Sequence, residues 1–179
     1  MKIVSLLVPL LSFICFADPE VSNEAGEAGW RFASHAEGGE AVFPHRLEMQ
    51  REGEAPVAVW RSFKPMAFLG YVEAGEYAVV FFADPLIRPS GNIILAWRLV
   101  AGKAPELIFA TPYSEDDGVD YDLRDLRAEG DRVLGRITAR LTEGHDELPA
   151  ILLDLNAQTP PIDFRSPLYP MPPVTWGGE

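Results

Sequence analysis

The densest group of potential ligands in the sequence is the stretch SEDDGVDYDLRD, residues 114–125, which holds six carboxylates in twelve residues. Carboxylate oxygens are the ligands that calcium prefers, and a dedicated calcium loop spaces them as D-x-[DN]-x-[DN]-G with a later glutamate. The acids on either side of Gly118 do not follow that spacing. We therefore predict no metal site and no cofactor, with calcium binding by Glu115, Asp116 and Asp117 as the open alternative.

A β-hairpin with the strand that follows also explains several of these acids. A three-residue loop over residues 129–131, with its central glycine in the left-handed conformation, pairs Val119 with Leu141 and places Asp120 opposite Arg140. This register collects the apolar side chains on one face, whereas a two-residue loop mixes the two faces. The acids then belong to an exposed, charge-paired face, where each cross-strand pair contributes about 0.2–1 kcal/mol.

Two features compete with this hairpin. Its register sets Arg124 opposite a second arginine, which is a like-charge pair. In addition, Val119, Leu123 and Leu126 recur at helical spacing, so a helix is the alternative for this segment. We favour the strand, because residues 132–141 alternate between apolar and polar side chains and need a neighbouring strand.

The catalytic signatures that depend on sequence spacing are missing. The three histidines, His35, His45 and His145, lack metal-binding spacing and are interpreted as surface or turn residues. No serine lies in G-x-S-x-G or S-x-x-K, and no glycine-rich stretch has the spacing of a nucleotide site. The single cysteine, Cys15, lies in a segment that we expect to be removed. A pair of carboxylates for glycoside hydrolysis depends on tertiary structure, so this chemistry stays an alternative.

Trp60 is the one residue that we single out as a candidate for ligand binding. In an extended segment it shares a face with Ala58 and Ser62, opposite Val57 and Val59, so we expect it on an outer face of the sheet. Exposed tryptophans commonly stack on ligands or anchor partners, whereas buried ones supply core area.

The elements that carry these residues are predicted to be strands. Short apolar runs separated by Gly, Pro and Asp recur at the spacing of an antiparallel β-sandwich, with a closed β-barrel as the alternative. The predicted strands cover residues 30–36, 41–50, 57–63, 68–73, 77–83, 92–100, 106–113, 119–126, 132–141 and 150–155. Two of them, 77–83 and 92–100, are apolar on both faces and are predicted to be central. The run 44–52 fits either a helix that begins at Pro44 or an exposed strand, and we favour an edge strand.

The two ends of the chain differ from this central region in composition. Residues 1–17 have one early lysine, an apolar run and small residues before Asp18, which is the layout of a cleaved signal peptide. Residues 18–29 are small and acidic, and we expect them to form a flexible leader to a β domain over residues 30–156. Residues 157–179 hold six prolines among large apolar side chains, so we predict an extended arm laid over the domain. The alternative is a Pro-rich ligand for the aromatic groove of a partner.

These observations favour an exported binding or interaction domain without catalytic activity, located in the periplasm or outside the cell. Its net charge of −12 repels nucleic acid and anionic membranes, and cleavage would leave no stable membrane anchor. The partner expected is a protein or a glycan that the sequence does not identify, and the sequence leaves the oligomeric state open. The alternatives are a carboxylate-dependent carbohydrate hydrolase or lyase, and a lipocalin-like carrier of a small apolar ligand.

Overall fold

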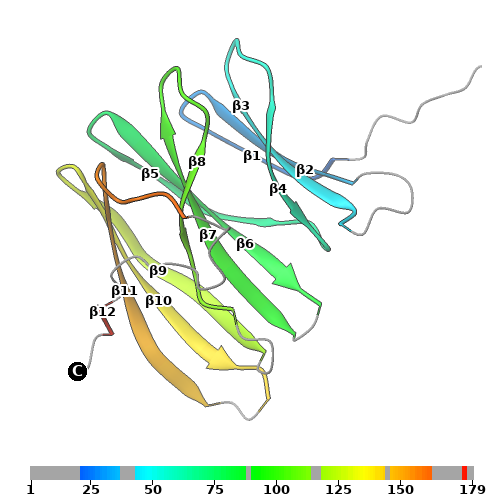
Figure 1. Ribbon diagram of the computed structural model, residues 1–179, viewed down its shortest axis with the longest axis vertical. Coiled ribbons are helices and arrows are strands. Elements are labelled where there is room, and N and C mark those ends of the chain that lie inside the picture. Colours follow the sequence, from blue (N-terminus) through cyan, green and yellow to red (C-terminus); the bar gives the residue numbers. More distant parts are fainter. Residues whose placement is uncertain are drawn as a thin grey trace, which may run out of the picture.

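Figure 1 shows the computed structural model, which describes residues 21–36, 43–87, 90–113, 118–143, 146–162 and 175–176. These residues form strands and no helix, and the strands pair into three antiparallel sheets. The predicted all-β, antiparallel fold is therefore confirmed. None of the described residues belongs to a helix that is long and apolar enough to cross a membrane.

Each sheet has four strands. The N-terminal sheet has the order β1 (Val21–Glu27), β2 (Trp30–Ala36), β3 (His45–Arg51), β4 (Val57–Ser62). The middle sheet has the order β5 (Ala67–Ala74), β6 (Tyr77–Leu86), β7 (Gly91–Val100), β8 (Glu106–Ala110). The C-terminal sheet has the order β12 (Thr175–Trp176), β11 (Glu147–Asn156), β10 (Arg132–Leu141), β9 (Val119–Glu129).

The middle sheet lies between the other two and is buried on both faces (Figure 1). Along β6, Val79 and Phe81 pack toward the C-terminal sheet, while Val80 and Phe82 pack toward the N-terminal sheet. Trp97 of β7 is 1% exposed and belongs to the core between the middle sheet and the N-terminal sheet. The prediction that both strands are central and apolar on both faces is confirmed.

The predicted β-sandwich is confirmed, with three stacked sheets, and among the described residues no sheet closes into a barrel. A strand that is apolar on one face needs one neighbouring layer, whereas a strand that is apolar on both faces needs two. Because both β6 and β7 are of the second kind, the fold has three layers, with one apolar core on each side of the middle sheet.

Two expectations for the N-terminal sheet were wrong. Residues 21–27, predicted as part of a flexible leader, form β1 by backbone pairing with β2. Strand β3, predicted to lie at an edge, pairs with β2 on one side and β4 on the other. Leu47 and Met49 of β3 are each 1% exposed, because this face of the strand packs in the core against the middle sheet.

The hairpin of β9 and β10 confirms the predicted strand and most of the predicted register. Val119 pairs with Leu141 and Asp120 pairs with Arg140, as the apolar alternation requires. The predicted three-residue loop was wrong, since Glu129 pairs directly with Arg132 across a two-residue turn. A bulge near Asp125, whose φ is +54°, supplies the extra residue that restores the predicted register farther along.

Neighbouring acids relieve the like-charge pair in this hairpin. Arg124 lies opposite Arg136, as predicted, but each arginine has an acid close by. Arg124 Nε lies 2.7 Å from Asp122 Oδ2, and Arg136 Nε lies 4.0 Å from Asp125 Oδ2. The two guanidinium groups are therefore drawn to different carboxylates rather than left facing each other.

Most of the Pro-rich arm, residues 163–174 and 177–179, lies outside the described residues. Its first part runs beside the middle sheet, where the backbone N–H of Ile162 donates to the carbonyl of Leu107. Thr175 and Trp176, beyond the last proline, pair with β11 as the short strand β12, although no strand was expected in the arm.

Candidate functional site

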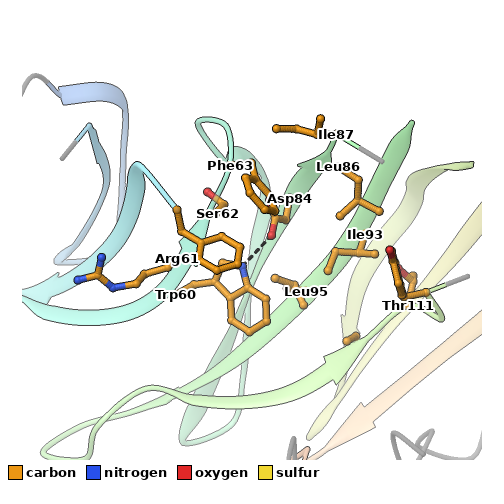
Figure 2. A pocket seen from close by; sticks show the side chains of 13 residues that line it. Trp60, Arg61, Ser62, Phe63, Asp84, Leu86, Ile87, Ile93, Leu95 and Thr111 are labelled. Atoms are coloured by element: carbon orange, nitrogen blue, oxygen red, sulfur yellow. Dashed lines mark hydrogen bonds between the residues drawn. The ribbon is translucent and has the colours of Figure 1, made fainter. Parts of the chain in front are cut away.

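A cleft of about 370 Å³ opens between β4 of the N-terminal sheet and the β6–β8 end of the middle sheet (Figure 2). Its walls are mostly aliphatic and aromatic, and the described residues of the walls include one acid and one base. The lining residues are Phe43, Trp60, Arg61, Ser62, Phe63, Asp84, Leu86, Ile87, Ile93, Leu95, Ala110, Thr111 and Tyr113. Pockets that bind small molecules have this character, with a few polar groups set in an apolar wall.

Asp84 stands at the end of a row of core side chains. Alternation along β6 places Ala78, Val80 and Phe82 toward the N-terminal sheet, and Asp84 is the next residue in that row. The strand continues through Pro85, which pairs with Asn92, so the row does not end before the acid. Asp84 is consequently 6% exposed, which is unusual for a carboxylate.

The Asp84 carboxyl group is incompletely paired. Trp60 Nε1 donates a hydrogen bond of 2.7 Å to Asp84 Oδ2, and this bond is drawn in Figure 2. No described residue hydrogen-bonds the other oxygen, Oδ1, which is also buried. Burial raises the pKa of Asp84 to about 6, and the hydrogen bond from Trp60 opposes this rise. The cleft therefore contains a carboxyl group that changes charge close to neutral pH.

Trp60 lies on the inner face of β4, which corrects the expectation of an outer face. It is half-buried and packs edge-on against Trp97, with ring centroids 6.2 Å apart. Its indole N–H points to Asp84, so one side of the ring belongs to the core and another part lines the cleft. The reason is the order of the layers, because the face that carries Trp60 meets the middle sheet.

The mouth of the cleft is unusually apolar. The large hydrophobic side chains Phe43, Phe63, Ile87 and Tyr113 are each 39–49% exposed, and all four line the cleft. The rings of Phe43 and Phe63 lie with their centroids 4.5 Å apart. Apolar side chains gathered around one opening indicate a surface that gains stability when something covers it.

Basic charge is turned away from the interior of the cleft. Arg61 follows Trp60 on β4, and strand alternation sends the two side chains to opposite faces. Figure 2 shows the Arg61 guanidinium directed away from the other side chains drawn. Among the described residues that line the cleft, Asp84 is thus the one ionisable side chain that is both charged near neutral pH and directed inward.

The acids and histidines of the sequence do not gather at this cleft. Asp120 and Asp122 lie on the outer face of the C-terminal sheet, where Arg140 Nη2 is 4.0 Å from Asp120 Oδ2. Within the described ranges, no three His, Cys, Asp or Glu side chains form a group that could hold a metal ion. Residues 114–117 and 144–145, and with them the acidic turn and His145, lie outside those ranges.

The two described histidines lie on the N-terminal sheet, His35 on β2 and His45 at the start of β3, and neither is among the residues that line the cleft. His35 Nε2 is 3.2 Å from Glu48 Oε2, and Arg46 Nη2 is 2.7 Å from Glu48 Oε1. These three side chains point away from the core that contains Leu47. They are therefore separated from the cleft by the sheet that carries them.

Sequence reasoning missed Asp84, which lies one residue beyond the predicted strand over residues 77–83. The signal that could have revealed it is the alternation of β6, since the carboxyl group continues the row of Val80 and Phe82.

Comparisons with protein-family models, with curated proteins and with solved structures each found no match to the chain.

Proposed function

We propose that this protein is an exported binding domain that holds a small, mainly apolar ligand in the cleft between β4 and the middle sheet. The observation that carries this proposal is the combination of apolar walls, an exposed apolar mouth and one buried, incompletely paired carboxyl group. The walls supply the area that a ligand buries, and the carboxyl group fixes its orientation.

The cleft fits this proposal better than the two alternatives drawn from the sequence. A carbohydrate hydrolase of the usual kind needs two carboxylates on either side of the scissile bond. The described lining of the cleft contains one, Asp84. A lipocalin-like carrier encloses its ligand inside a barrel, whereas this cleft lies between two open sheets.

Export is proposed from the sequence of residues 1–17, whose apolar run and small residues before Asp18 are typical of a signal peptide. A ligand-binding domain outside the cytoplasm would meet small molecules from the surroundings directly.

The test is a titration with a neutral two-ring aromatic, naphthalen-2-ylmethanol, followed by NMR in protein labelled with ¹⁵N-tryptophan. The indole N–H signal of Trp60, assigned with a Trp60→Phe variant, should shift on binding because it lies in the wall of the cleft. Ala110→Phe should weaken binding by filling the cleft. Ala128→Phe, on the exposed part of β9, is the matched control and should leave binding unchanged.

The proposal fails if the probe leaves the Trp60 signal unmoved, or if Ala110→Phe and Ala128→Phe bind the probe equally well. Circular dichroism of both variants shows whether the fold is retained, so that a loss of binding can be assigned to the filled cleft.

A further inference from the structure

We infer that the ligand of this cleft is a cation: a protonated amine on an apolar, preferably aromatic, body, whose ammonium group meets the Asp84 carboxylate. This inference rests on the proposed function and names the class of ligand. It is supported by the buried Asp84 oxygen that has no hydrogen-bond partner, and by the apolar and aromatic walls of the cleft. It is also supported by the outward direction of Arg61, the basic side chain among the described lining residues.

The negative charge of Asp84 is only partly compensated by its described neighbours. A carboxylate that is 6% exposed is costly unless a cation or several hydrogen-bond donors compensate it. The described neighbours supply one donor, the indole N–H of Trp60, and leave Oδ1 without a partner. A ligand ammonium carries both the missing positive charge and the missing donors. Because rotation about χ2 of an aspartate is soft, either carboxyl oxygen can turn toward such a group.

The described groups around Asp84 are aromatic, aliphatic or hydroxyl groups. On β4, Trp60 donates to Asp84, and Ser62, which lines the same cleft, donates its hydroxyl to the carbonyl of Lys64. On β7, Ile93 is the residue paired with Asp84, and Leu95 lines the same cleft; both are aliphatic. No described side chain directed into the cleft is basic, so nothing in the described lining competes with a ligand cation.

The aromatic side chains in the walls also favour a positively charged ligand. The faces of aromatic rings attract cations through their quadrupoles, and this attraction strengthens when water is excluded. Trp60, Phe43 and Phe63 all line the cleft, and the last two are exposed at its mouth. An ammonium ion entering past these rings is stabilised along its path, whereas a carboxylate ligand would meet their negative faces and the charge of Asp84.

The apolar part of the ligand has its own contact surface. Ile93 and Leu95 of β7 form the aliphatic wall opposite Trp60, and Ile87 extends that wall to the surface (Figure 2). A simple inorganic cation would leave this wall exposed to water. The apolar wall and the acid together therefore fit an organic amine better than a metal ion.

The experiment compares three probes of the same shape and different charge at pH 7.5. These are naphthalen-2-ylmethylamine, naphthalen-2-ylmethanol and naphthalene-2-carboxylate, each titrated while the Trp60 indole signal is recorded. A hydrogen bond to a charged group contributes enough to favour the amine over the alcohol by about tenfold to hundredfold. The carboxylate should bind most weakly.

Two charge-matched variants separate the local acid from the overall charge of the protein. Asp84→Asn keeps the size and the acceptor for Trp60 but removes the negative charge, so the amine should fall to the affinity of the alcohol. Asp120→Asn removes the same charge from the outer face of the C-terminal sheet, and it should keep the full preference for the amine.

The outcomes distinguish this inference from the function on which it rests. If the alcohol binds and the amine binds no more tightly, the cation inference is overturned while the binding site stands. The same conclusion follows if Asp84→Asn retains the preference, or if Asp120→Asn abolishes it. If none of the three probes moves the Trp60 signal, the proposed binding site itself is overturned.

Discussion

The two faces of the middle sheet begin alike along β6 and end differently. Toward the C-terminal sheet, Val79 and Phe81 are completely buried in a core that includes Ile94 of β7. Toward the N-terminal sheet, the equivalent row passes Val80 and ends at Asp84, where the cleft opens. We call these the closed face and the open face. The same strand thus supplies a sealed core and a wall of the proposed binding cleft, and the two rows differ at Asp84.

The largest effect should separate neighbouring isoleucines of β7. Ile94 is fully buried on the closed face, so Ile94→Ala should lower the free energy of unfolding by about 2–5 kcal/mol. Ile93 is half-buried in the wall of the cleft, so Ile93→Ala should cost roughly 1 kcal/mol but weaken ligand binding. Urea denaturation and titration with the naphthyl amine measure the two effects.

The comparison between the faces would lose its basis if Ile94→Ala changed the affinity as much as Ile93→Ala did. It would also lose its basis if the two substitutions cost the same stability. Each isoleucine is the control for the other, because the change in side-chain volume is identical.

A second effect concerns pH and belongs to the open face alone. Burial raises the pKa of Asp84 from its ordinary value of 3.8 to about 6. The folded state therefore holds this proton more tightly, so the stability that Asp84 contributes is present below pH 3.8 and is lost as the pH rises through 6. Relative to Asp84→Asn, the wild type should lose up to about 3 kcal/mol between pH 4 and pH 8.

Chemical denaturation of both proteins at a series of pH values measures this difference. Taking the difference between the two proteins removes the titration of all other groups, which they share. Parallel stability curves from pH 4 to pH 8 would show that Asp84 titrates at its ordinary value and is not desolvated.

The closed face should also depend on a close approach between β7 and β9. Gly91 has φ +134°, and a Cβ there would lie 2.3 Å from the carbonyl oxygen of Val119. Gly91→Ala should cost about 1–3 kcal/mol, because the two strands must separate. Gly102→Ala is the control, since Gly102 also has a positive φ but has no atom within 4 Å of its Cβ position. Equal melting temperatures for the two variants would contradict the close approach.

The smallest effect is expected on the outer face of the C-terminal sheet, far from both cores. Arg140→Glu places a like charge opposite Asp120 and should cost about 0.2–1 kcal/mol. The charge-swapped double variant, Asp120→Arg with Arg140→Glu, should recover that loss. An unchanged melting temperature in the single variant would count against the register of β9 and β10.

Much of the fold could be predicted, because strand alternation reports which faces are buried. The doubly apolar pattern of residues 77–83 and 92–100 identified the two central strands of the middle sheet. Strand β1 was missed since its sequence, VSNEAGE, has no apolar period, and it is held by backbone pairing with β2. The bulge at Asp125 was missed because its positive φ is a local conformation that residue patterns do not specify.

The site was harder to predict than the fold. Trp60 was selected from the sequence, but its face was assigned wrongly because the order of the layers was unknown. Asp84 was overlooked because Asp followed by Pro is a common turn signal, whereas β6 continues through both residues. The pairing of Trp60 with Asp84 joins residues 24 positions apart, and only the packing of two sheets brings them together.

The central claim is that the open face binds a cation through Asp84, and the most direct measurement is the pKa of this one side chain. The side-chain carboxyl ¹³C signal of Asp84, followed through a pH titration by NMR, should give a pKa near 6 in the free protein. Saturation with naphthalen-2-ylmethylamine should lower that pKa, because a bound ammonium favours the carboxylate. A pKa that stays the same or rises when the amine is bound would contradict the claim.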